Sequence, residues 1–307
     1  MMEPLFTCLA FGLAMVAPGL PSTPSSGVRI ADTQQSFSSL VVKSLSAMPR
    51  GGGYSVRRNA AEALSRRAVV WKEADGLKIA PQMAQPSFCS EACYLVLLLA
   101  LREWEQREKQ ALPAAFWKAA RVDLGQPDGL RAWGRVNANG PGIAKWVHDL
   151  GAGVNFTDPN AARPGDFLKI FWTREIGQKE FGHLVVFLGI EKGPDGPALR
   201  FWSSNKPGGY GEKTVPLAKT SRLLFTRITR PDRFGACSSL PEKDLWLAAM
   251  QKKHFSFDEV RRACGVRSAP TTSEDHGPDA RRLRAVMGND WRIRNPLSSL
   301  QSTSGSL

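Results

Sequence analysis

The chain is organised around Gln85-Pro86-Ser87-Phe88-Cys89-Ser90-Glu91-Ala92-Cys93-Tyr94, which continues as an almost unbroken apolar run from Leu95 to Leu101. Pro86 and Ser87 are typical of the entry to a helix, and the hydroxyl of Ser87 can accept a backbone N–H of the first turn. The Leu- and Ala-rich continuation is apolar on every side. This pattern predicts a helix that is buried in the core of a domain.

Cys89 falls in the first turn of this predicted helix. The unsatisfied N–H groups and the positive end of the helix dipole favour a negative charge there, so a thiol in this position loses its proton more readily than a thiol in a core. That placement is typical of a nucleophile. The five cysteines are odd in number and irregularly spaced, which does not indicate a disulfide framework. Cys93 is expected to point into the core as a small apolar side chain.

The length of 307 residues allows one sizeable domain with appendages or two small domains. The net charge of +13 predicts attraction to polyanions such as nucleic acid, anionic lipid or an acidic cell-wall polymer, although a solubilising surface explains it equally well. No zinc-finger spacing, Walker loop or aromatic-basic pattern is present, so no specific nucleic acid is expected. Cys89 and Cys93 with His148 and His183 do not form an established zinc spacing. We therefore expect no metal and no cofactor.

Composition divides the chain into four parts. Residues 1–57 are interpreted as an apolar leader and a disordered linker, 58–235 as the folded domain, 236–266 as a helical extension, and 267–307 as a mostly disordered tail. The apolar segment Leu5–Ala17 has the length of a secretory signal core but lacks a preceding Lys or Arg. Export to the periplasm or the extracellular space is favoured, and a cytoplasmic location stays open. No segment is expected to span a membrane.

The predicted order of elements is helices first and an antiparallel sheet afterwards, which points to an α+β domain. Helices are expected over 60–72, from Cys89 to about Gln110, and over 114–122, 143–150, 241–250, 257–264 and 280–286. An irregular loop is expected over 133–142. Strands are expected over 167–172, 183–190, 199–204, 214–217 and 223–228.

A thiolate nucleophile needs a base and a third polar group that orients the base. The sequence has four histidines, and His183 is the candidate base because it opens an apolar strand, where the sheet fixes the backbone and leaves the imidazole at the rim. The third group is expected at the end of the following strand. Asn205 can accept a hydrogen bond from one ring nitrogen, and Ser203, on the same face, is the alternative. An Asn that only opens the following turn is nearly as well supported.

Three motifs in order resemble the NlpC-type and CHAP cysteine peptidases of bacterial cell walls. They are Pro86-Ser-Phe-Cys89-Ser90 before an apolar helix, Arg163-Pro164-Gly165-Asp166-Phe167, and Gly182-His183-Leu-Val-Val-Phe-Leu-Gly189. The resemblance covers roughly residues 58 to 230 and implies a papain-like fold with N-terminal helices packed on an antiparallel sheet. It implies Cys89 as nucleophile, His183 as base and the strand end from Ser203 to Asn205 as the third member. The family supplies an acid or amide there, and this chain has no carboxylate.

The resemblance implies hydrolysis of a peptide or amide bond of peptidoglycan through an acyl-enzyme. Peptidoglycan or another acidic wall polymer is the expected partner of a monomeric protein, and an immunity or inhibitor protein is a further candidate partner. The expected cleft walls are Trp133, Asn137, Asn139 and Trp172. A non-catalytic wall-binding module with the same fold is the alternative function.

Overall fold

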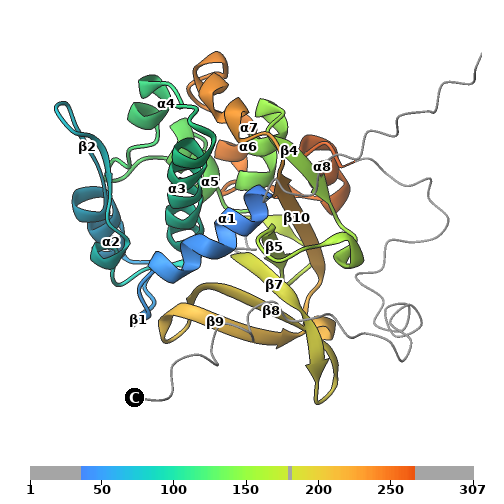
Figure 1. Ribbon diagram of the computed structural model, residues 1–307. Helices are drawn as coiled ribbons and strands as arrows, with labels where there is room; N and C mark the ends of the chain where they lie inside the picture. The colour runs from blue at the N-terminus through green and yellow to red at the C-terminus, as the bar shows by residue number, and fades with distance from the viewer. Residues whose placement is uncertain (1–35, 179–181, 267–307) are drawn as a thin grey trace, which may run out of the picture. The chain divides into compact units, whose positions relative to one another are not determined.

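The computed structural model describes residues 36–178 and 182–266, with most helices preceding the main strands (Figure 1). The helices are α1 Phe37–Ser44, α2 Arg58–Ala63, α3 Cys89–Glu108, α4 Ala114–Ala119, α5 Arg131–Asn137, α6 Gly142–Leu150, α7 Leu245–Ala249 and α8 Phe257–Ala263. The strands are β1 Gly51–Gly52, β2 Val69–Lys72, β3 Gly76–Ile79, β4 Gly153–Phe156, β5 Phe167–Phe171, β6 Ile176–Gly177, β7 His183–Gly193, β8 Gly196–Asn205, β9 Gly209–Pro216, β10 Arg222–Ile228 and β11 His254–Phe255. The predicted α+β class is confirmed.

A seven-stranded sheet with the order β1-β9-β8-β7-β5-β10-β4 forms the largest element. All of its neighbours are antiparallel. Strand β7 pairs with β5 on one side and with β8 on the other. Strands β7 and β8 form a hairpin with a turn between Gly193 and Gly196. The predicted strands are present as β5, β7, β8, β9 and β10. The short strands β1 and β4 were not predicted, because no alternating pattern marks them and pairing with β9 and β10 holds them in place.

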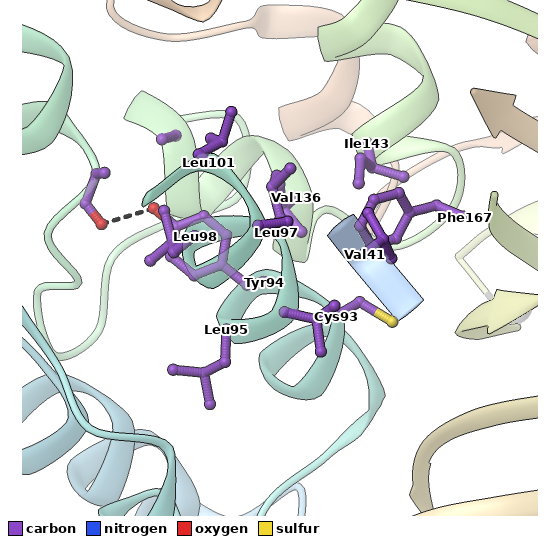
Figure 2. Close-up of a cluster of buried hydrophobic side chains, with 14 of the residues drawn as sticks. Val41, Cys93, Tyr94, Leu95, Leu97, Leu98, Leu101, Val136, Ile143 and Phe167 are labelled. Carbon is purple, nitrogen blue, oxygen red and sulfur yellow. Dashed lines mark hydrogen bonds between the residues drawn. The ribbon is translucent and has the colours of Figure 1, made fainter. Parts of the chain in front are cut away.

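Helix α3 is buried along most of its length, as its sequence predicts. Leu95, Leu97 and Leu98 have no exposed surface. Each such side chain contributes about 1.5–3 kcal/mol through burial. Figure 2 shows α3 side chains with residues from other elements, among them Val136 of α5 and Phe167 of β5, and these belong to one hydrophobic core. The helix packs on β7 and β8, which fixes its first turn against the sheet.

The start of α3 differs in detail from the prediction. Phe88 is the N-cap, and the carboxylate of Glu91 accepts its backbone N–H at 3.1 Å. Ser87 does not cap the helix, because its buried hydroxyl donates to the hydroxyl of Ser204 in β8 at 2.9 Å. The hydroxyl of Ser204 in turn donates to the carbonyl of Ser87 at 3.0 Å. These bonds tie the entry of α3 to the end of β8.

Regular structure is present before residue 58, the predicted start of the folded domain. Helix α1 packs against α3 at an oblique angle (Figure 1), and Phe37, Leu40 and Val41 are buried in the main core. Their spacing of three and four residues forms an apolar helix face. The Ser- and Gly-rich composition around this short face led to the wrong prediction of a linker.

The turn before β5 is stabilised by a buried carboxylate. Asp166 has no exposed side-chain surface and accepts two hydrogen bonds from the guanidinium of Arg227, at 2.9 and 2.6 Å. It also accepts the backbone N–H of Arg163 at 2.8 Å and the hydroxyl of Ser38 at 3.3 Å. Gly165 has φ +91°, and a side chain there would collide with the carbonyl of Ser38. The turn therefore joins α1, β5 and β10.

Two further predictions fail locally. The predicted helix over 60–72 ends with a π-helical turn at Ala68, and the β-branched and aromatic residues that follow form β2, which pairs with β3. The predicted loop over 133–142 begins inside helix α5, because Trp133 and Val136 are buried against α3. The predicted helices over 114–122 and 143–150 are present as α4 and α6, and Gly151 ends α6 with φ +61°.

The C-terminal part that the structure describes packs onto the main sheet. Helix α7 is shorter than predicted, and α8 has the predicted capping box between Ser256 and Glu259. Val260 and Cys264 are buried with Phe171 of β5 and Leu224 of β10, so 236–266 belongs to the same compact unit as the sheet. The predicted leader, the tail and the helix over 280–286 lie outside the described residues.

Between residues 36 and 178 and between 182 and 266, no helix combines the length and the apolar character that crossing a membrane requires.

Candidate active site

Cys89 is the first residue of α3 and is half-buried. In the first turn of a helix the backbone N–H groups lack intrahelical acceptors, so the site around the sulfur is rich in donors. Cys93 lies one turn later and is fully buried, and burial raises the pKa of its thiol well above the ordinary value. The two thiols of one helix therefore have opposite character, as the sequence predicts.

His183 opens β7, and its imidazole acts on the neighbouring thiol of Cys89. Burial by itself raises the pKa of Cys89, but the hydrogen bond and charge of His183, the charge of Lys169 and the backbone of Leu184 outweigh it. The net effect lowers the pKa of Cys89 from 9.0 to about 6. The thiol is therefore largely ionised at neutral pH, which is the state that attacks a carbonyl.

Asn205 ends β8 and lies next to His183. Its Oδ1 is 3.0 Å from Nε2 of His183. The Nδ2 group donates to the carbonyls of Gly211 at 2.8 Å and Ser203 at 3.2 Å, so the amide oxygen faces the imidazole. Oδ1 then accepts Nε2–H, and this tautomer leaves Nδ1 as the acceptor that faces sulfur. His183 thus lies between Asn205, to which it is hydrogen-bonded, and Cys89, whose pKa it lowers.

Ser203, the alternative third member, has another role. Its hydroxyl is buried and donates to the carbonyl of Leu184 at 2.8 Å. This bond joins β8 to β7, and the imidazole is hydrogen-bonded to Asn205 instead of Ser203. The structure thus selects Asn205 over Ser203.

Lys169 is a member of the site that the sequence analysis did not identify. It is almost fully buried in β5, opposite Leu184 of β7, and its charge helps to lower the pKa of Cys89. Its ammonium also lies 5.8 Å from the centroid of the Phe171 ring. A lysine inside the apolar strand Phe167-Leu168-Lys169-Ile170-Phe171 was the signal that could have found it, since buried lysines are rare.

Tyr54 and Glu91 also adjoin the thiol and were not predicted. Tyr54 reaches the site because its segment pairs with Ser87, immediately before α3. Burial, followed by the charges of Cys89 and Glu91, raises the pKa of Tyr54 to about 12. Burial raises the pKa of Glu91 well above its ordinary value, helped by the charge of Cys89. Tyr54 is therefore neutral beside the thiolate at neutral pH, and Glu91 holds its proton more readily than an ordinary glutamate.

The predicted cleft walls separate into two groups. Trp172 is 40% exposed, and its ring centroid is 6.5 Å from that of His183. Trp133 instead packs in the core against Phe88 and Tyr94, because burial of its large ring is favourable. Asn137 accepts the hydroxyl of Ser90 at 2.8 Å, beside Cys89.

Asn139 and Asn137 belong to a polar network under the helix start. Asn137 donates to Asp128 at 3.1 Å, and Asn139 donates its side-chain N–H to the carbonyl of Gly177 at 2.7 Å. Gln251 also donates to Asp128, at 2.8 Å. These amide side chains hold α3, α5 and the C-terminal segment in position. The Gly- and Asn-rich sequence does not reveal this structural role.

A cavity of about 820 Å³ opens beside the imidazole. His183, Asn205, Tyr54 and Trp172 line it, so a bound molecule can approach the imidazole of His183 from this side.

The other thiols and histidines of residues 36–178 and 182–266 do not form a second site. Cys237 and Cys264 are free thiols, and burial raises the pKa of both. His148 lies in the last turn of α6 and His254 in β11, both at exposed positions. Within the described ranges, no three His, Cys, Asp or Glu side chains gather where they could hold a metal ion.

No family model matches the chain, and neither a curated protein nor a solved structure is significantly similar to it.

Proposed function

We propose that this protein is a cysteine amidase or peptidase that hydrolyses a peptide or amide bond, with peptidoglycan as the substrate. One observation carries the proposal: His183 lowers the pKa of the adjacent Cys89 thiol at a helix start, and Nε2 of the same imidazole is 3.0 Å from Oδ1 of Asn205. Nucleophile, base and orienting group in this order form the general arrangement for nucleophilic catalysis on a carbonyl.

The first half of the reaction forms the acyl-enzyme. The thiolate of Cys89 attacks the carbonyl carbon, a C–S bond forms, and the carbonyl oxygen becomes an oxyanion. The backbone N–H of Cys89, at the first position of α3, is a donor for that oxyanion. The imidazolium of His183 then gives its proton to the amine nitrogen, and the C–N bond breaks.

The second half releases the acid. His183 takes a proton from water, the hydroxide attacks the thioester carbon, and the C–S bond breaks to restore the thiolate. Asn205 holds the imidazole in one tautomer and orientation throughout, because its own amide is fixed by two carbonyls. Peptidoglycan as the substrate follows from the family resemblance, and the net charge of +13 suits an acidic wall polymer.

The test is incubation of the full chain with purified peptidoglycan, followed by mass spectrometry of the released fragments. The native protein is expected to release fragments whose masses identify one amide bond, and Cys89→Ala to release none. Cys237→Ala is the matched control, because Cys237 is also half-buried but lies outside the site. An active and correctly folded Cys89→Ala variant contradicts the proposal. Wall binding without cleavage by the native protein supports the non-catalytic binding module instead.

A further inference from the structure

The cavity beside His183 has a charge pattern that the hydrolytic mechanism does not use. Strands β8 and β9 contribute Lys206, which follows the end of β8, and Lys213 to its lining. No acidic residue is among the described residues that line it. The imidazole and the two ammonium groups therefore face one cavity of about 820 Å³.

Within the described part of the chain, neither lysine is neutralised by a neighbour. Among the described residues, no carboxylate forms an ion pair with Lys206 or Lys213. The neighbouring Glu212 points to the other face of β9, as alternation in a strand requires, and its carboxylate accepts from Arg200 at 3.3 Å. The ammonium of Lys206 lies 5.4 Å from the centroid of the Tyr54 ring, which directs it over the cavity wall that Tyr54 forms.

The rest of the lining is largely apolar and aromatic. Phe201 and Val215 contribute to it from β8 and β9, and Trp172 and Val56 are exposed by 40% and 68%. Exposed apolar side chains next to unpaired cations fit a ligand that has an aliphatic stem and an anionic group. A neutral or cationic ligand would leave both ammonium groups without a partner.

We propose that this cavity binds a carboxylate-bearing peptide, with the carboxylate between Lys206 and Lys213 and the stem against Trp172. This inference rests on the proposed function, because it names the substrate class of the same site: an amide whose neighbouring residue has a free carboxyl group. Specificity for the substrate then comes from β8 and β9 and not from the residues that perform the chemistry.

The test measures binding without turnover in the full-length Cys89→Ala variant. Isothermal titration compares N-acetyl-alanyl-glutamate with N-acetyl-alanyl-glutamine, both as C-terminal amides, so that the two peptides differ only in the side-chain carboxylate. We expect the acid to bind about fivefold to thirtyfold more tightly at low salt, as two partly exposed ion pairs allow. The preference should decrease as salt rises.

Substitution then assigns the preference to the two lysines. In the background of Cys89→Ala, Lys206→Gln with Lys213→Gln is expected to bind both peptides equally. Lys192→Gln is the matched control, because Lys192 is an exposed lysine at the opposite end of β7 from His183. Circular dichroism confirms that each variant is folded.

Equal binding of both peptides, no binding of either, or a preference that survives the double substitution would overturn the inference. Tighter binding of inorganic phosphate than of the acidic peptide would also overturn it, because the site would then select a different anion. A carboxylate preference that is lost with the two lysines, in a protein that leaves peptidoglycan intact, would uphold the cavity and reject the proposed function.

Discussion

Oδ1 of Asn205 lies 3.0 Å from Nε2 of His183, although the residues are 22 positions apart. The antiparallel hairpin of β7 and β8 brings the first residue of one strand beside the last residue of the other. Asn205 and His183 are therefore held by the same backbone ladder. The entry to α3 joins them through the bonds between Ser87 and Ser204.

Asn205→Ala should lower kcat by about tenfold to hundredfold. General acid–base catalysis as a whole contributes roughly 10²–10⁴-fold, and this variant loses only the orientation of the base. The imidazole keeps its hydrogen bond to sulfur but loses the acceptor that fixes its tautomer. Asn205→Asp keeps an acceptor and should restore part of the rate. Steady-state kinetics on a released peptidoglycan fragment measure both variants. Full activity of Asn205→Ala would show that the amide has no orienting role.

Alkylation of Cys89 by iodoacetamide should follow a titration with a midpoint near the pKa of about 6. His183→Ala should move this midpoint above the ordinary thiol value, because burial raises the pKa of Cys89 once its main stabilising partner is absent. Peptide mapping by mass spectrometry separates Cys89 from Cys237, and His148→Ala is the control that should leave the midpoint unchanged. A native midpoint in the ordinary thiol range would disprove the activation of Cys89.

Lys169→Met should raise the same midpoint, but by less than His183→Ala, because the charge of Lys169 contributes less to the pKa of Cys89 than His183 does. Methionine keeps the length and the buried apolar stem. Lys169→Arg keeps the charge and should leave the midpoint close to the native value. If Met and Arg shift the midpoint equally, packing and not charge is the contribution of Lys169.

Glu91→Gln should weaken the pH dependence of stability. Burial raises the pKa of Glu91 above its ordinary 4.5, so the folded protein keeps a proton that the unfolded chain releases. The contribution of Glu91 to the free energy of unfolding is fully present below the ordinary pKa of the unfolded chain, and it is lost as pH rises through the raised pKa of the folded protein. Gln is neutral and still accepts the N–H of Phe88. The free energy of unfolding, measured with urea, should decrease less from about pH 5 to about pH 8 in the variant than in the native protein. An identical decrease in both proteins would contradict the prediction.

Asp166→Ala should reduce the free energy of unfolding by about 3–5 kcal/mol, because Arg227 then loses its buried partner. The alkylation midpoint of Cys89 should stay unchanged, since Asp166 acts on the turn and not on the thiol. Asp232→Ala removes the exposed pair with Arg230 and should have a much smaller effect. Urea denaturation checks the ranking, which would be contradicted if the two variants lost equal stability.

Long elements with a regular pattern could be predicted from the sequence, and short ones could not. The apolar run after Cys89 and the alternating strands from Phe167 onward carry their own signal. Helix α1 was missed because its apolar face has few residues in a polar surrounding, and α5 because a helix that contains Gly134 and Asn137 depends on packing against α3. Strands β1 and β4 depend entirely on their partners.

By itself, the sequence determined which side chains could do the chemistry: a cysteine at a helix start, a histidine at a strand start and a polar strand end. Local patterns suffice for these features, because helix and strand ends follow from neighbouring residues. Only the tertiary structure decided that Asn205 and not Ser203 faces the imidazole, and that Lys169, Tyr54 and Glu91 surround the sulfur. The reason is that strand pairing and core burial, which act between residues far apart in the chain, set these contacts and the resulting pKa values.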